Sequence, residues 1–474
     1  MLNVQPQFSR GMVSFVPRGR QPEPADTNDE GAPMKTRLLI VTTTILLVAA
    51  ACSGDDTSTT DTSEQQSGST TSTSVDGRVI DDVDINPGDF TNPTQVTNSL
   101  YPVSEVTYAV MLGEDEGEPL RVEVALTPDV KTIEWADSST ETVVSQFIGL
   151  IDGQLTEVAY DWFAQDDAGN VWYFGEDVFN YEAGVVANMD GTWIAGEDGP
   201  PGMIMPADPR VGDIYHPENI PDLVYEEDLV VSTSETVEGP SGPIEGAMLV
   251  QETVEGTIEE KYWAPGYGEF HAIVPGTEDV KVVFALPNDA QAEPVPPELR
   301  DLQQGAAEAY DQAVGEDWEA LTAAFADLQS DWETYDPGSR SVLPEAFVSA
   351  VDQALTALDT ATTDHDPEAA AEAAVALELG VVDVMMTHGD PEDVQRIGAL
   401  SRRLELEATA EDPGAAANTV AMIASLWARG SGSVSDPSGI DEAVETLESA
   451  AADEDFAALV EGAIALRDRL PAAG

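Results

Sequence analysis

Apolar and polar residues alternate in short runs over residues 79–292. Examples are 105–111, 121–126 and 280–286, where charged and apolar positions follow one another with a period of about two. This period places apolar side chains on one face of a β-strand and leaves the other face to water. Turn-forming clusters separate the runs, so we predict an antiparallel sheet, either strongly curved or closed into a β-sandwich.

The clearest predicted hairpin joins residues 160–165 to residues 171–176 through a turn that contains Gly169 and Asn170. Both turn residues tolerate positive φ, which a tight connection needs. Alternation along the two strands sends part of this aromatic-rich hairpin into the core, and the other part either joins the core or lines a ligand groove. The aromatic candidates for ligand binding are Trp162, Trp172, Tyr173, Phe174, Trp193 and Trp263.

From residue 293 to residue 474 the apolar pattern changes to a helical period. One stripe of apolar side chains recurs every three or four residues, as expected for a helix with one buried face. Aspartates stand where helix N-caps belong, and three of them precede a proline at the first helical position. The stripe consists of Trp318, Leu321, Phe325, Leu328 and Trp332. The predicted N-caps are Asp317, Asp366, Asp390, Asp412 and Asp455.

The helical half contains an internal duplication, because residues 316–332 align without gaps on residues 411–427. The two repeats span 298–388 and 391–470, each with two helical hairpins. They form either two four-helix units or one eight-helix bundle. The matched Trp332 and Trp427 are interpreted as core anchors, with stacking on a ligand as the alternative.

Residues 34–51 have the basic head, apolar body and small-residue exit of an export signal. The apolar body is shorter than the roughly 20 residues that span a bilayer. Residues 52–78 are rich in Ser, Thr and Asp and predict a disordered tether. Residues 1–33 are interpreted as a mis-assigned start, or alternatively as a cytoplasmic extension of an uncleaved signal anchor.

The end of this signal, Val48 to Cys52, resembles the lipobox of a bacterial lipoprotein. The resemblance implies cleavage before Cys52 and attachment of lipid to its thiol, which would anchor the chain to the outer face of the cell membrane. Cys52 is also the only cysteine in the sequence, so no disulfide within the chain is expected.

Charge limits the choice of partners, because the formal net charge is -71. Such a surface repels nucleic acid and anionic lipid, and we expect no nucleic-acid partner. The acidic residues are interpreted as a solvated surface, with weak multivalent cation binding as the sharper alternative.

Several segments of the β half resemble an uncharacterised domain family of secreted and lipid-anchored bacterial proteins, mainly actinobacterial. The resemblance covers residues 88–286 and implies location and fold more than chemistry. A looser similarity of 261–268 to exported carrier-like β proteins implies an apolar ligand groove, and the helical half is faintly similar to imelysin-type bundles. The segments that carry the main resemblance are 90–93, 101–103, 160–177, 202–213 and 261–268.

Metal-ligand types cluster in two places of the β half. Oxygen-rich loops bind Ca²⁺, but EF-hand spacing is absent here and turn roles explain the same residues. Asp213 and His216 could offer two ligands, or belong to a solvated turn. The hairpin candidates are Asp161, Asp166, Asp167 and Asn170. We predict no cofactor, with Ca²⁺ as the alternative.

No catalytic motif with local spacing occurs, so the first hypothesis is a non-catalytic, lipid-anchored cell-surface binding protein. Its partner would be a small apolar ligand or an envelope protein, and it requires a cavity along the sheet. The alternatives are an exported hydrolase with converging carboxylates in the β half, or a metal-handling helical bundle.

Overall fold

A computed structural model describes most of the chain after the predicted tether. All of the described residues belong to a single compact unit. Cys52 and residues 1–51 lie outside the described residues. The described ranges are 73–75, 78–84, 86–136, 138–221, 223–254, 256–290, 294–335, 337–389 and 391–471.

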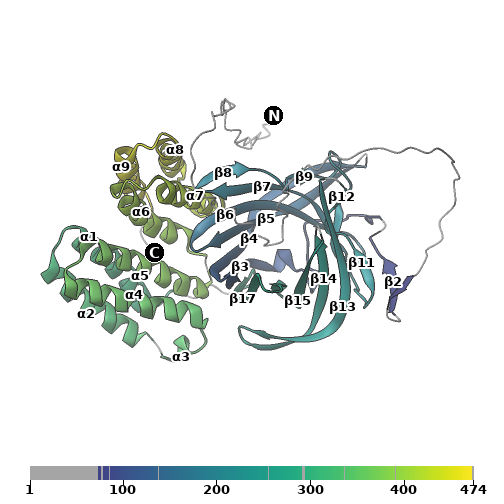
Figure 1. The fold of residues 1–474 in the computed structure, drawn as a ribbon, viewed down its shortest axis with the longest axis horizontal. Coiled ribbons are helices and arrows are strands. Elements are labelled where there is room, and N and C mark those ends of the chain that lie inside the picture. Colours follow the sequence, from purple (N-terminus) through teal and green to yellow (C-terminus); the bar gives the residue numbers. More distant parts are fainter. Residues whose placement is uncertain are drawn as a thin grey trace, which may run out of the picture. The chain divides into compact units, whose positions relative to one another are not determined.

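The strands of the described residues form one large, mainly antiparallel sheet, as predicted (Figure 1). The strand β1 falls within the segment predicted as tether, so strands begin earlier than expected. The strands are β1 (Thr73–Val75), β2 (Arg78–Asp82), β3 (Val106–Asp115), β4 (Glu118–Trp135), β5 (Ser138–Ile151), β6 (Gln154–Gln165), β7 (Val171–Glu182), β8 (Val185–Asn188), β9 (Trp193–Ile194), β10 (Gly202–Met205), β11 (Asp213–Tyr215), β12 (Asn219–Ile220), β13 (Val224–Gly239), β14 (Gly242–Val254), β15 (Thr257–Ala264), β16 (Gly268–Val274) and β17 (Glu278–Pro287).

Most neighbours in the sheet are also neighbours in the sequence. Strands β3 to β7 pair in succession, strands β13 to β17 do the same, and β17 pairs with β3 to join the two runs. Beyond β13 the sheet continues through β11 to β2, and the β2–β11 pairing is parallel. This parallel step brings the start of the β half beside the segment that follows β11.

The predicted hairpin is confirmed as β6 and β7. Its turn is held by Asp166, whose carboxylate accepts hydrogen bonds from the backbone N–H groups of Ala168 and Asn170 at 2.9 and 3.0 Å. Gly169 adopts φ +96°, a left-handed conformation that glycine reaches without a steric cost. Local turn chemistry therefore fixes the register of this hairpin.

Both faces of the central strands are buried. Ile148, Leu150 and Leu155 share a core with the second set of helices, while Phe147 and Ala159 belong to a core of strand residues alone. Alternate side chains of β5 and β6 thus face helices on one side and the inside of the sheet on the other. This explains why β5 is buried almost without interruption from Val143 to Ile151.

Eight long helices and one single-turn helix, α3, follow the sheet within the described residues. Strand β17 ends at Pro287 and the first helix begins at Pro297. The helices are α1 (Pro297–Val314), α2 (Trp318–Thr334), α3 (Pro337–Arg340), α4 (Glu345–Asp364), α5 (Pro367–Met385), α6 (Asp393–Thr409), α7 (Pro413–Gly430), α8 (Ser438–Ala452) and α9 (Phe456–Arg467). The described part of the chain also has three short 3₁₀ segments, Val103–Glu105, Met386–His388 and Ser431–Ser433.

The duplication is visible in equivalent side-chain contacts. Trp332 on α2 donates its indole N–H to Asp352 on α4 at 2.7 Å, and Trp427 on α7 donates to Asp441 on α8 at 2.8 Å. Both tryptophan rings are buried, as the core-anchor interpretation requires. Each indole therefore ties the second helix of its repeat to the third.

The helix caps agree with the sequence prediction at four positions: Asp317, Asp366, Asp412 and Asp455 each accept a hydrogen bond from a backbone N–H of their helix. The fifth prediction is wrong, because α6 begins at Asp393 and not at Pro391. Glu392 adopts φ +57°, a left-handed conformation, so the right-handed helix cannot extend back through this residue. Asp390 lies outside the described residues.

A buried ionic network joins β4 to the helices. Glu123 accepts hydrogen bonds from Arg121 on its own strand, Arg396 on α6 and Arg429 on α7, at 2.8, 2.6 and 2.9 Å. Arg121 also makes a two-fold contact with Asp383 on α5, at 2.8 and 2.9 Å. The two repeats are thus held on the sheet by charged groups as well as by apolar packing.

Candidate functional site

The six aromatic candidates lie in the core. Their exposed fractions do not exceed 2%, and all belong to one cluster of buried residues inside the sheet. Tyr173 stacks on Phe163 at 4.8 Å and meets Trp193 edge-on at 5.4 Å between ring centroids. Trp172 and Tyr173 are both buried although they point to opposite faces of the hairpin, because both faces pack against other residues of this cluster. These side chains support the sheet and do not line its cavity.

The oxygen ligands of the predicted Ca²⁺ site do not converge. Asp166 accepts hydrogen bonds within its own turn and from the Trp172 indole at 2.9 Å. Asp167 accepts two hydrogen bonds from Thr91. Asn170 donates to Asp166, whereas Asp161 points into the sheet. Hydrogen bonds within the turn therefore engage Asp166 and Asn170, and hydrogen bonds from Thr91 engage Asp167.

Asp161 begins a chain of buried carboxyl groups inside the sheet. It accepts a hydrogen bond from the Tyr173 hydroxyl at 2.7 Å and shares another with Glu176, which is its cross-strand partner on β7. Glu176 in turn hydrogen-bonds Glu218, which accepts from the Trp193 indole at 2.8 Å. Burial raises the pKa of Asp161 and of Glu218 to about 7. The carboxyls converge as the hydrolase hypothesis requires, but they are buried at 0–2% exposure.

A second group of buried acids surrounds Lys261 on β15. The Lys261 ammonium lies 2.6 Å from Glu252, and 3.8 Å from both Glu226 and Glu269. Burial opposes its charge, but these carboxylates outweigh burial and raise the pKa of Lys261. Burial also raises the pKa of Glu269 to about 7 and that of Glu278 to about 10. The inside of the sheet is therefore rich in acids and poor in bases.

A cavity of about 80 Å³ opens on this inner face. Its walls are mostly apolar and come from strands β3 to β6, from β16 and β17, and from the segment that precedes β3. Two acids, Asp161 and Glu269, belong to the lining. The apolar and small lining residues include Val103, Ala109, Met111, Val122, Phe147 and Val280.

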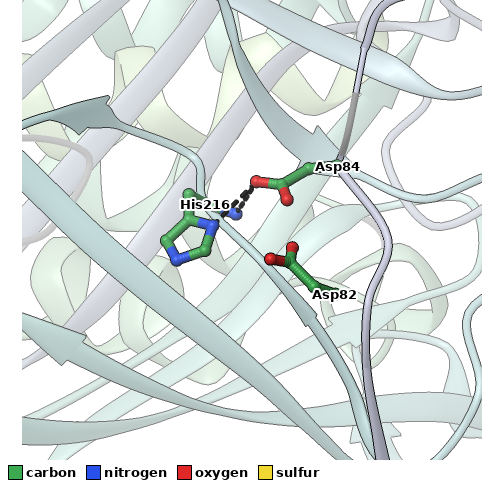
Figure 2. A group of neighbouring side chains, drawn as sticks. All are labelled: Asp82, Asp84 and His216. Atoms are coloured by element: carbon green, nitrogen blue, oxygen red, sulfur yellow. Dashed lines mark hydrogen bonds and ion pairs between the residues drawn. The ribbon is translucent and has the colours of Figure 1, made fainter. Parts of the chain in front are cut away.

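A third arrangement lies where β2 runs beside β11. Asp82, Asp84 and His216 bring one ligand atom each to within 4.8 Å of one another (Figure 2). Within the described ranges this is the one group of His, Cys, Asp and Glu side chains with such spacing. Asp82 is exposed, Asp84 is partly buried and His216 is buried, so the group sits at the protein surface.

Strand pairing positions all three side chains. Ile214 on β11 pairs with Asp82 on β2, and the backbone N–H of Val83 donates to the Ile214 carbonyl at 3.0 Å. Asp82 and Asp84 are two residues apart in extended chain, so both side chains point to the same side. His216 follows β11 directly and faces them, as Figure 2 shows.

The contacts of His216 are short and involve both ring nitrogens. One oxygen of Asp84 lies 2.8 Å from Nδ1 and also accepts the backbone N–H of His216 at 2.8 Å. On the other side of the ring, the Tyr225 hydroxyl lies 2.9 Å from Nε2 and a Glu227 oxygen lies 3.8 Å away. The imidazole is therefore held in one orientation.

The electrostatics reflect this crowding of acids. A hydrogen bond with Asp84, followed by burial, raises the pKa of Asp82 to about 6. Burial alone would raise the pKa of Asp84, but hydrogen bonds with His216 and Asp82 outweigh it and lower that pKa. Burial opposes the charged form of His216, yet its bond to Asp84 raises the pKa of the imidazole. The group is therefore a partly buried His–carboxylate pair with an exposed carboxyl, that of Asp82, beside it.

Sequence reasoning found His216 but paired it with Asp213, which does not belong to this group. Asp213 accepts a hydrogen bond from the backbone N–H of Arg210 at 2.8 Å and so holds its own turn. The two aspartates that do approach His216 lie 132 and 134 residues earlier in the chain. Their alternation as Asp82-x-Asp84 was the one local signal, and it is common in so acidic a sequence.

Comparison of the chain with protein-family models and with curated proteins finds no match. The lipoprotein, secreted β-domain and imelysin resemblances therefore stay predictions. Within the described residues, no helix combines the length and the apolar character needed to cross a membrane.

Proposed function

We propose that this protein is a lipid-anchored, extracytoplasmic binding protein whose β half binds a divalent transition-metal ion through Asp82, Asp84 and His216. The observation that carries the proposal is the convergence of an imidazole and two carboxyls from distant parts of the chain. The lipid anchor on Cys52 and the extracytoplasmic location rest on the sequence pattern alone.

The donor set favours Zn²⁺ or a similar first-row ion. Zn²⁺ binds imidazole nitrogen and carboxylate oxygen at roughly 2.0–2.2 Å, whereas Ca²⁺ takes six to eight oxygen ligands. One nitrogen and two carboxylates fit the first ion and are too few for the second. Three protein ligands leave a further position for water or for a partner's ligand.

The neighbours of the group suit this role. The backbone N–H that donates to Asp84 fixes the position of that carboxylate, and the Tyr225 hydroxyl at Nε2 fixes the plane of the His216 ring. Such outer contacts orient metal ligands and strengthen binding. An ion at this group would also tie β2 to the sheet, because two of its three ligands belong to the segment that begins in β2.

The test is calorimetric titration of chelator-treated, dialysed protein with Zn²⁺, Mn²⁺ and Ca²⁺, followed by metal analysis. We expect saturable 1:1 binding with Zn²⁺ preferred over Ca²⁺. His216→Ala should weaken Zn²⁺ binding by about tenfold or more, which corresponds to about 1.4 kcal/mol.

His271 supplies the matched control. Its Nε2 lies 2.8 Å from Asp279 in a cross-strand pair, and no third ligand joins that pair among the described residues. His271→Ala should therefore leave Zn²⁺ affinity unchanged. Equal Zn²⁺ affinity in His216→Ala and in the unaltered protein would overturn the proposal, and His216 would then be a structural latch for β2.

A further inference from the structure

The cavity inside the sheet supports a second proposal, which does not depend on the metal-binding proposal. We propose that the cavity between Asp161 and Glu269 binds a small organic cation, a primary ammonium ion with a short alkyl chain. The argument rests on the size of the cavity, the chemistry of its walls and the balance of charge around it.

The size of the cavity limits the ligand. At about 80 Å³ it exceeds the roughly 10–15 Å³ that a single water needs by the same kind of measure. It is far smaller than the usual drug-sized pocket of about 300–1,000 Å³. A molecule of a few non-hydrogen atoms fits this space, and a lipid chain does not.

The walls of the cavity favour an alkyl group. Met111, Val122, Phe147 and Val280 belong to the lining, and all four are buried members of the strand core. A hydrated inorganic ion would gain nothing from such walls, because apolar side chains replace none of its water ligands. An alkyl chain would exchange water for these contacts, which is favourable.

The charges around the cavity favour a positive headgroup. Asp161 and Glu269 are its two ionisable carboxyl groups, and the lining contains no Lys, Arg or His. Glu269 has Lys261 at 3.8 Å, but no basic side chain lies within ion-pair distance of Asp161 in the described part of the chain. Asp161 accepts a hydrogen bond from the Tyr173 hydroxyl and shares one with Glu176, but neither contact supplies a positive charge.

An ammonium ion would bring a positive charge next to these two carboxyl groups, whereas a neutral ligand would not. Buried carboxylates are costly unless a cation or a hydrogen-bond donor compensates them. An ammonium group offers one positive charge and three N–H donors, which carboxylate oxygens can accept. Asp161 is the polar exception on this face of the strand, because its neighbours there, Ala159 and Phe163, are apolar.

The experiment is titration of the purified protein with methyl-, ethyl- and propylammonium chloride at pH 8 and 150 mM NaCl, monitored by ligand-observed NMR. Methanol, ethanol and propanol serve as neutral probes of matched shape. We expect saturable 1:1 binding of at least one ammonium ion and no saturable binding of its alcohol.

Two variants test separately whether binding needs the charge of Asp161 and whether it needs the open volume of the cavity. Asp161→Asn keeps the shape and removes the charge, and should weaken ammonium binding by about tenfold or more, as expected for a lost charge-assisted hydrogen bond. Ala109→Leu keeps the charge and fills the cavity, and should abolish binding. Glu278→Gln is the matched control, since Glu278 is buried in the same sheet but does not line the cavity.

Three results would overturn the inference. They are equal binding of the ammonium ion and its alcohol, unchanged affinity in Asp161→Asn, and binding that does not saturate. The last would show that the acidic surface attracts the cation. The cavity variants alter none of the proposed metal ligands, so we expect them to leave Zn²⁺ affinity unchanged. Either proposal can therefore fail without the other.

Discussion

Replacing Glu123 by glutamine should test the ionic network that holds the helical repeats on the sheet. Glu123 is 1% exposed, and its two oxygens accept hydrogen bonds from three arginines. The network has no net charge, because three carboxylates balance the three guanidinium groups. The members of the network are Arg121, Arg396, Arg429, Glu123, Asp383 and Asp393.

The magnitude follows from charge balance. Glu123→Gln leaves three guanidinium groups with two carboxylates, Asp383 and Asp393; the side chains of Arg396 and Arg429 are buried and that of Arg121 is partly exposed. Loss of one partner from a buried ion pair costs about 3–5 kcal/mol of unfolding free energy, because the remaining charge stays buried without compensation. The low pKa of Glu123, which burial opposes and the arginines enforce, agrees with a carboxylate that is strongly stabilised in the folded state.

The assay is urea denaturation followed by far-UV circular dichroism. Glu123→Gln should lower the midpoint by an amount equivalent to about 3–5 kcal/mol, with the slope unchanged if unfolding stays cooperative. The double variant with Arg429→Gln restores two charges of each sign, and should cost less than the sum of the single variants.

Asp208→Asn is the control for this prediction. Its partner Arg210 lies 3.0 Å away, but both side chains are more than three-quarters exposed. We expect a loss of no more than about 1 kcal/mol from this exposed pair. If Glu123→Gln costs as little as Asp208→Asn, the network does not stabilise the junction and the reasoning above is refuted.

Two further predictions concern pH and the membrane. The raised pKa values of Asp161, Glu218 and Glu269 give stability that is fully present below about pH 4 and lost as pH rises through about 7. Each group contributes up to about 1.4 kcal/mol per pH unit, so the urea midpoint should fall between pH 5 and pH 8, and a rise would contradict their burial. Cys52→Ser should abolish incorporation of labelled fatty acid and release the chain from the membrane fraction, and unchanged labelling would exclude the lipid anchor.

The aromatic residues of the β6–β7 hairpin show what a local sequence pattern can predict and what it cannot. Alternation correctly placed the strands and turn of the β6–β7 hairpin, because turn chemistry and a period of two are local properties. It could not show that Trp162 and Trp172 are both enclosed. That outcome depends on residues far away in the sequence, such as Met203, Met205 and Tyr215, which belong to the same buried cluster. The groove predicted at these side chains is therefore core, and the cavity lies elsewhere on the sheet.

The repeats were predicted more completely, because their signals are local. Asp317, Asp366, Asp412 and Asp455 cap helices as expected. The start of α6 was predicted wrongly because Glu392 adopts a left-handed conformation. Glutamate rarely adopts this conformation, so the sequence gives no sign of it. Caps and stripes identify helices well, whereas exact ends depend on how the chain enters each helix.

By itself the sequence determined the order of the two halves, the antiparallel sheet, the duplicated helices and the four caps, since each follows from neighbours along the chain. Tertiary structure alone decided which acids meet. Strand β2 lies parallel to β11, which carries Asp82 and Asp84 to His216, and the inward face of β6 carries Asp161 to the cavity. The physical reason is that a site depends on strand pairing over more than 100 residues, and 90 acidic residues allow too many pairings for sequence to choose among them.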